Sequence, residues 1–188
     1  MHSYPIRIFD ILFSILGILL AAPLILVIFV IGLASGGKPL FYQQRVGRNQ
    51  RPFTLVKFRS MATNTRSVGT HLVDSNAITP MGRFLRRSKL DELPQLFNVL
   101  LGDMSLVGPR PCLPNQHELI DERESRGVFD AAPGITGLAQ VNGVDMSNPR
   151  KLAIYDSLMI RNMSLGKYLC LILATATGRG GGDRVKYG

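Results

Sequence analysis

The longest apolar run of the chain lies near its N-terminus and predicts a helix embedded in a membrane. Residues 11 to 34 form 24 consecutive positions without a charge. About 20 apolar residues suffice for a helix to cross the hydrocarbon core of a bilayer. A run that is apolar on every side does not fit the surface helix of a soluble domain. The apolar part of a cleavable signal peptide is shorter, about 7–15 residues, although Ala34-Ser35-Gly36 imitates a cleavage site.

Pro23 lies in the middle of this run and leaves two arrangements open. Proline cannot donate a hydrogen bond to the carbonyl four residues earlier, here Leu19, and its ring bends the helix. Either a kinked helix spans the bilayer, or a helix–break–helix hairpin enters and leaves the same face. Each arm of the hairpin would be about 18 Å long, which is too short to cross alone.

Cations gather on the C-terminal side of the apolar run and predict its orientation. They are Lys38, Arg45, Arg48, Arg51, Lys57 and Arg59. Before the run stands only Arg7, which is offset by Asp10. The positive-inside rule therefore places the part after the run in the cytoplasm in both arrangements. The same cations are expected at an anionic leaflet, each contributing about 1 kcal/mol of attraction.

Two short segments after the run predict a β-hairpin. Residues 38–47 indicate a short strand closed by a turn. Residues 53–58 alternate weakly and contain β-branched residues, and the turn Gly47-Arg48-Asn49-Gln50 lies between the two strands. Lys57 and Arg59 then lie on one side of a strand. Residues 62–80 are polar and weakly patterned, which predicts a loop with one helical turn over the site.

Residues 83–111 carry the candidate chemistry. Four cations, Arg83, Arg86, Arg87 and Lys89, precede the adjacent acids Asp91 and Glu92, and Pro109-Arg110-Pro111 follows a short apolar run. Nearby arginine keeps an aspartate ionised. An ionised carboxylate can bind Mg²⁺ or attack an electrophilic phosphorus. Two prolines fix the backbone around the guanidinium of Arg110, which suits phosphate binding. Surface salt bridges are the alternative explanation of these charges.

The helix that follows the two acids has two candidate starts. If Asp91 is the N-cap, Pro94 falls in the tolerated first turn, and both carboxylates lie at the positive end of the helix dipole. If Ser88 is the N-cap, Pro94 falls inside the helix and kinks it. Gly102 predicts the end of the helix in either case.

Three further helices are predicted in the C-terminal part. Residues 117–129 indicate an exposed helix whose charges form a solvated face. Residues 149–162 indicate a helix that carries Asp156. Residues 165–176 are too short to span a membrane and too apolar for a free surface, so this helix is expected on the membrane or against the anchor, with a core helix as the alternative.

A turn-rich segment, Pro133-Gly-Ile-Thr-Gly137, lies between the first two of these helices. Its glycines, Gly134 and Gly137, predict a loop whose backbone approaches a ligand closely. It is not a P-loop, because the chain has no GxxxxGK[ST] pattern.

Composition and charge narrow the classes of partner. The chain has 188 residues, 46% of them hydrophobic, and a net charge of +9 from 22 basic and 13 acidic residues, so it is expected to bind polyanions. Tryptophan is absent and no cluster interleaves basic and aromatic residues, so nucleic acid is not expected as a partner. Cys112 and Cys170 have no CxxC spacing and are expected as reduced thiols.

Motifs along nearly the whole chain resemble the bacterial sugar transferases. The longest is GRFLRRSKLDELPQLFNVLLGDMSLVGPRP at residues 82–111. The others are FYQQRVG at 41–47, KFRSM at 57–61 and PGITGLAQVNG at 133–143. Members of this family are monotopic phosphoglycosyl transferases that begin assembly of O-antigen, capsule or glycan on a polyprenol carrier. The length of this chain matches the small members, which consist of the catalytic domain.

The resemblance implies a mostly helical α+β fold that enters the membrane from one face. Residues 1–37 would form a Pro-broken re-entrant helix hairpin around Pro23. Residues 38–177 would form the cytosol-facing catalytic domain with a small β-hairpin and amphipathic surface helices, and 178–188 a Gly-rich flexible tail. The family often has serine before this proline, whereas Ala22 stands here.

The resemblance also implies a two-step reaction. Asp91 matches the nucleophile of the family and Glu92 its partner. Both would hold Mg²⁺, and assistance of proton transfer is the alternative role of Glu92. Asp91 would attack the β-phosphate of a UDP-sugar, expected to carry an N-acetylated hexosamine or a deoxy relative, and UMP would leave. Polyprenol phosphate would then take the phosphosugar from the aspartate.

By position, further residues would bind or support the substrates. Those expected at phosphates are Arg86, Arg110, Lys57 and Arg59, and those expected in supporting roles are Asp156, Pro109, Pro111 and Gln140. The expected location is the bacterial inner membrane, with membrane lipids and downstream glycosyltransferases as partners, and a homodimer is compatible with it. The alternatives are a membrane-tethered scaffold without activity and an enzyme acting on phospholipid head groups.

Overall fold

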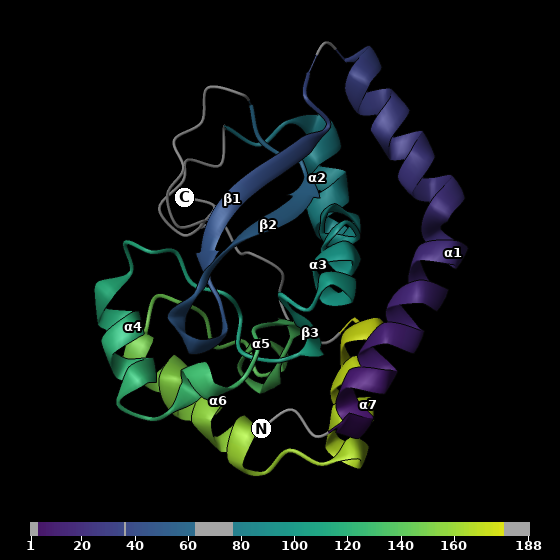
Figure 1. The fold of residues 1–188 in the computed structure, drawn as a ribbon. Coiled ribbons are helices and arrows are strands. Elements are labelled where there is room, and N and C mark those ends of the chain that lie inside the picture. The colour runs from purple at the N-terminus through teal and green to yellow at the C-terminus, as the bar shows by residue number, and fades with distance from the viewer. Residues whose placement is uncertain (1–3, 36, 63–76, 179–188) are drawn as a thin grey trace.

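The protein consists of a long N-terminal helix, α1 (Tyr4–Ala34), and a mixed body of short elements packed beside it (Figure 1). The computed structural model describes residues 4–35, 37–62 and 77–178. Most of the predicted loop 62–80 and of the predicted tail 178–188 therefore lies outside the described residues. The other elements, in chain order, are β1 (Leu40–Val46), the 3₁₀ turn η1 (Arg48–Gln50), β2 (Pro52–Phe58), α2 (Pro80–Arg87), the 3₁₀ turn η4 (Leu90–Glu92), α3 (Gln95–Leu101), β3 (Ser105–Val107), α4 (His117–Glu124), the 3₁₀ turn η5 (Val128–Asp130), β4 (Gly134–Thr136), α5 (Leu138–Val141), α6 (Pro149–Arg161) and α7 (Leu165–Ala176).

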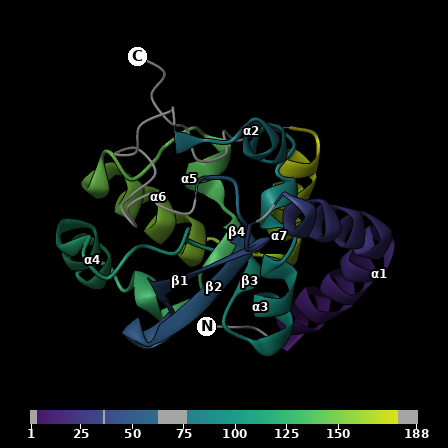
Figure 2. The same cartoon turned by 90° about the horizontal axis from the view of Figure 1, so that it is seen from above.

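Helix α1 continues through Pro23, so no non-helical break divides it. Figure 2 shows it bent into two arms instead. A proline inside a helix removes one hydrogen bond and crowds the preceding turn, and a bend relieves that crowding. The predicted break is thus a bend within one continuous helix.

Most of the apolar surface of α1 is uncovered. Only 6% of the most apolar 18-residue stretch of α1 is buried, and the helix is long and apolar enough to cross a membrane. Leu19 and Leu20, near the middle of the helix, are 67% and 74% exposed. Exposed leucine and isoleucine on this scale are unfavourable in water, which makes a membrane location plausible.

The N-terminal arm of α1 is docked on the body through Asp10, which is fully buried. Its Oδ1 accepts hydrogen bonds from Ser105 Oγ at 3.0 Å, from Leu106 N at 2.8 Å and from Tyr168 Oη at 2.7 Å. Burial raises the pKa of Tyr168, and the nearby Asp10 raises it further, so the phenol remains a donor at neutral pH. One carboxylate therefore joins α1 to β3 and α7.

Arg7, one turn earlier, docks the same arm on α3. Its Nη1 donates to Val99 O at 2.6 Å and its Nη2 donates to Leu100 O at 2.9 Å. The last carbonyls of a helix lack partners within the helix and carry partial negative charge, so a guanidinium there is stabilising. Arg7 and Asp10 thus bind the body at separate places instead of offsetting each other.

Both arms of α1 pack against that same body. Ile6 in the first arm joins a core cluster with Val99 and Tyr168. Ile28 in the second arm is 4% exposed and packs with Phe58 and Leu85. In Figure 1, α7 lies beside the first arm. From the sequence, α7 was expected either on the membrane surface or against the N-terminal anchor. In the structure, α7 packs against that anchor, helix α1.

The predicted β-hairpin is confirmed. Strands β1 and β2 pair antiparallel from Leu40 opposite Phe58 to Val46 opposite Pro52. The connecting turn is tight because Asn49 and Gln50 adopt left-handed backbone conformations, with φ of 52° and 57°.

The structure contains a second pair of strands that was not predicted. Strands β3 and β4 form a short parallel pair where a ligand-binding loop was predicted. A side chain on Gly134 would collide with the backbone of Gly108, and one on Gly137 would lie 2.5 Å from Gly108 O. These two glycines therefore allow the approach of another backbone segment, and that segment leads into Pro109.

Asn98 fastens α3 to the outer edge of β2. Its Oδ1 accepts from Val56 N at 3.1 Å and its Nδ2 donates to Thr54 O at 2.8 Å, so the amide pairs with β2 as a third strand would. The side chain is 2% exposed within an otherwise apolar segment. Because α3 follows the acidic pair directly, this contact also fixes the acidic pair relative to the hairpin.

Replacing Asn98 with alanine is expected to lower the free energy of unfolding by about 1–3 kcal/mol, because it leaves a backbone donor and a backbone acceptor without their partner. For a chain of this size that corresponds to a fall of several degrees in the melting temperature in detergent. Asn142→Ala is the matched control, since its amide makes one exposed bond, to Leu138 O. Equal shifts for the two variants would contradict this role of Asn98.

Candidate active site

Asp91 and Glu92 lie in η4, the short turn between α2 and α3. Asp91 is 7% exposed, and the side chain of Glu92 is 16% exposed. Lys89, just before the turn, has a φ of 58°, and this left-handed conformation is uncommon for a residue with a side chain. It redirects the chain after α2, so that the two acids reach the interior of the protein from an irregular segment.

Neither predicted helix start is correct. Ser88 ends α2, and its hydroxyl donates to Phe84 O at 2.8 Å, so it is not available as an N-cap. Pro94 immediately precedes α3, where the missing N–H of proline costs nothing. The predicted end is confirmed, because Gly102 caps α3 in a left-handed conformation with φ of 94°.

Glu92 is paired with Arg110, 18 residues further along the chain. The Oε1 of Glu92 lies 3.1 Å from Nη2 of Arg110, and the arginine side chain is 22% exposed. An ion pair with this much solvent contact adds little to stability, about 0–1 kcal/mol. Its significance is positional, because it brings the acidic pair and the Pro-Arg-Pro segment into one site, as the sequence predicted.

The Pro-Arg-Pro segment is held by its main chain. Four consecutive carbonyls, of residues 109–112, each accept one hydrogen bond, and the donors come from β4, α4 and β1. The pairs are Pro109 O with Gly134 N at 2.9 Å, Arg110 O with Arg123 Nη1 at 2.9 Å, Pro111 O with Arg45 Nη1 at 3.0 Å, and Cys112 O with Val46 N at 3.0 Å. Two prolines and four anchored carbonyls leave the backbone around Arg110 little freedom.

Arg45 was expected among the cations at an anionic leaflet, and that expectation is wrong. It is 8% exposed, and besides Pro111 O it binds Gln43 Oε1 at 2.6 Å. A guanidinium can satisfy several acceptors in a fixed planar arrangement, which suits a buried structural role. The alternation of β1 turns this side chain inward, towards the Pro-Arg-Pro segment.

Arg123 and Asp156 form a buried ion pair behind this segment. Nε and Nη2 of Arg123 donate to Asp156 Oδ2 at 3.0 Å and 2.7 Å, and the side chains are 2% and 1% exposed. Burial raises the pKa of Asp156, and the guanidinium of Arg123 opposes that change. The sequence assigned the charges of α4 to a solvated face, and for Arg123 this is wrong. Asp156 reaches the site through Arg123 and the carbonyl of Arg110.

The two cations of the hairpin lie near one aromatic ring. Lys57 Nζ is 5.8 Å and Arg59 Cζ is 5.4 Å from the centre of the Phe41 ring, within the range of cation–π attraction. Arg59 also donates to Lys38 O at 2.9 Å and to Leu40 O at 3.1 Å. It therefore holds the start of β1 in place.

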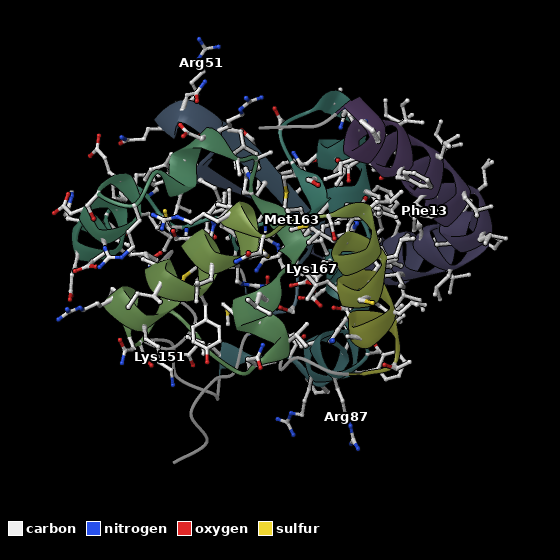
Figure 3. All side chains as sticks on the ribbon, turned by 90° about the horizontal axis from the view of Figure 1, so that it is seen from below. Phe13, Arg51, Arg87, Lys151, Met163 and Lys167 are labelled. Atoms are coloured by element: carbon white, nitrogen blue, oxygen red, sulfur yellow. The ribbon has the colours of Figure 1, made fainter. Side chains whose placement is uncertain are left out.

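The remaining predicted residues lie on two different elements. Arg86 is partly buried in the last turn of α2, ahead of η4. Figure 3 shows its neighbour Arg87 projecting away from the body. Gln140, in α5, donates from Nε2 to Ile135 O in β4 at 2.8 Å, so it supports β4.

The donor set at the site suits a magnesium ion. Within the described ranges no group of three His, Cys, Asp or Glu side chains could hold a metal by itself. Mg²⁺ in phosphoryl-transfer sites is usually bound by one or two carboxylates together with substrate phosphates and water. Asp91 and Glu92 match that requirement.

Comparison with known proteins identifies the family of this chain. The family model for bacterial sugar transferases matches residues 1–179, so the chain belongs to the bacterial sugar transferase family. It is 36% identical over 187 residues to the undecaprenyl-phosphate galactose phosphotransferase of Salmonella typhimurium, covering 90% of this chain and 39% of that protein. It is 40% identical over 171 residues to the uncharacterized sugar transferase EpsL of Bacillus subtilis, covering 88% and 83%. It is 46% identical over 148 residues to the undecaprenyl-phosphate glucose phosphotransferase of Komagataeibacter xylinus, covering 73% and 27%. The chain thus spans less than half of the first and third relatives.

Proposed function

We propose that this protein transfers a sugar 1-phosphate from a UDP-sugar to polyprenol phosphate and releases UMP. The observation that carries the proposal is the pairing of Glu92 with Arg110 at 3.1 Å. It supports a phosphate-binding role for Arg110, whose guanidinium pairs with the residue that follows Asp91 in the chain. A nucleophilic carboxylate next to a fixed cation is the arrangement that attack on a phosphate anion requires.

The reaction runs in two displacements at phosphorus. A carboxylate oxygen of Asp91 attacks the β-phosphorus of the UDP-sugar, and the bond from that phosphorus to the bridging oxygen of UMP breaks. A phosphate oxygen of polyprenol phosphate then attacks the same phosphorus, and the bond to Asp91 breaks. Each step substitutes one P–O bond for another, so Asp91 is regenerated.

Charge is the main obstacle in both steps, because anions must approach one another. Arg110 faces the acidic pair and is suited to bind phosphate oxygens that gain charge in the transition state. Glu92 orients Arg110 before substrate arrives. Bound at Asp91 and Glu92, Mg²⁺ would supply further neutralisation of the phosphates.

We further propose that α1 enters the membrane as a re-entrant helix, with both ends at the cytoplasmic face. Support comes from the contacts of its two arms with one body, through Asp10 in the first arm and Ile28 in the second. A helix crossing the bilayer would carry its first turns to the other side of the membrane, away from β3 and α7. The site would then lie at the inner membrane surface, where a soluble nucleotide meets a lipid phosphate.

Turnover tests the proposal directly. We expect the protein in a bilayer mimic with Mg²⁺ to release UMP from one UDP-sugar of a panel over many turnovers only when polyprenol phosphate is present in substrate amounts. The names of the relatives give galactose and glucose, and N-acetylated hexosamines and deoxy sugars complete the panel. Chelation of Mg²⁺ by EDTA is expected to lower the rate at least about a hundredfold, with recovery on adding Mg²⁺ back.

Two other outcomes would overturn the proposal. A membrane-tethered scaffold would release no UMP from any donor. An enzyme acting on phospholipid head groups would turn over cytidine nucleotides or phospholipids in parallel reactions. An unchanged rate in EDTA would contradict the requirement for Mg²⁺ but would not contradict the proposed transfer reaction.

A further inference from the structure

We propose that Arg123 is a positioning residue that fixes the backbone position of Arg110 in the active site. The inference rests on the proposed function, because Arg110 matters only if it binds substrate phosphate. Arg123 lies in α4, 13 residues beyond Arg110, and its side chain does not belong to the acidic pair or to its cations. It acts on the site through a backbone atom.

The guanidinium of Arg123 has two sides with separate tasks. Nε and Nη2 both donate to Oδ2 of Asp156, at 3.0 Å and 2.7 Å. Nη1 donates to Arg110 O at 2.9 Å. Because the guanidinium is planar and rigid, the bonds to Asp156 fix the direction of Nη1. A lysine has one nitrogen and cannot reproduce this geometry.

Arg110 depends on this contact because of the residues that flank it. Pro109 and Pro111 have no N–H, so this part of the chain is anchored mainly through its carbonyls. The anchors at Pro109 and Pro111 hold the flanks, whereas Arg123 holds the peptide carbonyl of Arg110 itself. A displacement of about 1 Å at a group that orients substrate can lower the rate about a hundredfold.

Burial separates this role from that of an ordinary ion pair. Arg123 and Asp156 are 2% and 1% exposed, and a buried ion pair is weak grounds for stability because desolvation offsets its attraction. A surface ion pair lies nearby, between Glu122 in α4 and Arg126 just after the end of α4; the two are 2.5 Å apart and 25% and 28% exposed, Arg126 being the less exposed. The side chain of Arg126 donates to Glu122 O and to Ser125 Oγ, near its own place in the chain, which makes Arg126 a suitable control.

The experiment compares Arg123→Lys, Arg110→Lys and the double variant in the UMP-release assay, with Arg126→Lys as control and the melting temperature of each protein recorded. Arg123→Lys is expected to lower kcat about 10–100-fold with little change in KM for the UDP-sugar, while Arg126→Lys stays at the wild-type rate. The double variant is expected to be little worse than Arg110→Lys, because Arg123 acts only through Arg110.

Several outcomes would overturn the inference. A wild-type kcat in Arg123→Lys, when Arg110→Lys has lost activity, would refute it. So would losses that multiply in the double variant. If Arg123→Lys does not fold, Asp156→Asn replaces it in the same cycle, with the same coupling to Arg110 expected. A wild-type protein that releases no UMP would instead refute the proposed function.

Discussion

Asp91→Asn is expected to abolish a covalent intermediate and to lower turnover at least about a thousandfold, as removal of an attacking group generally does. Asparagine has nearly the shape of aspartate, so the 7% exposed side chain still fits its place in η4. Its amide oxygen, however, is a poor nucleophile toward phosphorus. The variant therefore separates the chemistry of Asp91 from its packing.

The measurement is intact mass after incubation with the active UDP-sugar and Mg²⁺ in the absence of polyprenol phosphate. Wild type is expected to gain the mass of one sugar phosphate and to release one UMP per protein, while Asp91→Asn gains nothing. Asp121→Asn serves as the control, since it changes an exposed carboxylate on α4. Glu92→Gln is expected to form the same adduct more slowly, because Asp91 is intact while Arg110 loses its ionic partner.

Multiple turnover by Asp91→Asn at the wild-type rate would contradict covalent catalysis at this residue. An adduct that persists in Asp91→Asn would assign the nucleophile to another side chain. Absence of an adduct in a wild type that still turns over would favour direct attack by polyprenol phosphate on the UDP-sugar.

Features whose cause is local in the chain could be predicted from the sequence. The hairpin follows from alternation and turn residues within 20 positions, and the end of α3 follows from Gly102. The grouping of Asp91, Glu92 and Arg110 was also predictable, because their chemistry is shared and the motif is compact. Both cysteines are free, as expected.

Features that depend on distant partners had no such signal. Asp156 and Arg123 are 33 residues apart, and an arginine that points inward from a short charged helix has the same local pattern as a solvated one. Asn98 likewise looks like an interruption of an apolar run until β2 is placed beside it. Buried polar side chains are specified by the groups that they satisfy, and those groups come from the tertiary fold.

The predictions of where the helix after the two acids begins were wrong for a different reason. Ser88 and Asp91 both have good N-cap chemistry, and local propensity cannot choose between them. Left-handed Lys89 and the 3₁₀ turn place the acids between two helices, in an arrangement that a regular helix would not allow. Irregular backbone at functional sites is a common departure from local preference.

The docking of α1 provides the second large effect. Asp10→Leu is expected to lower the free energy of unfolding by about 3–5 kcal/mol, because it leaves three buried donors without their acceptor. For a chain of this length that corresponds to roughly 10 °C in the melting temperature. Tyr168→Phe removes one of the three donors and is expected to cost about 1–2 kcal/mol.

Ser14→Ala is the matched control on the same face of α1, one turn after Asp10. Ser14 is fully buried, and its Oγ has no hydrogen-bond partner within the described part of the chain. Removing a buried polar group that is not satisfied should be neutral or slightly stabilising. The expected order of destabilisation is therefore Asp10→Leu, then Tyr168→Phe, then Ser14→Ala. An equal loss for Asp10→Leu and Ser14→Ala would show that packing, and not the hydrogen-bond network, docks the arm.

The same variants test the proposed topology. A cysteine placed at Ser3, in a background where the exposed Cys170 is serine, is expected to react with a membrane-impermeant reagent only from the cytoplasmic side in the wild type. Asp10→Leu extends the apolar run toward the N-terminus and removes the contacts that hold the first arm against β3 and α7. Labelling from the outer side should then appear in this variant and not in Ser14→Ala. If it appears already in the wild type, α1 spans the membrane and its docking on the body must be revised; if it never appears, the bend at Pro23 keeps α1 on one face without help from Asp10.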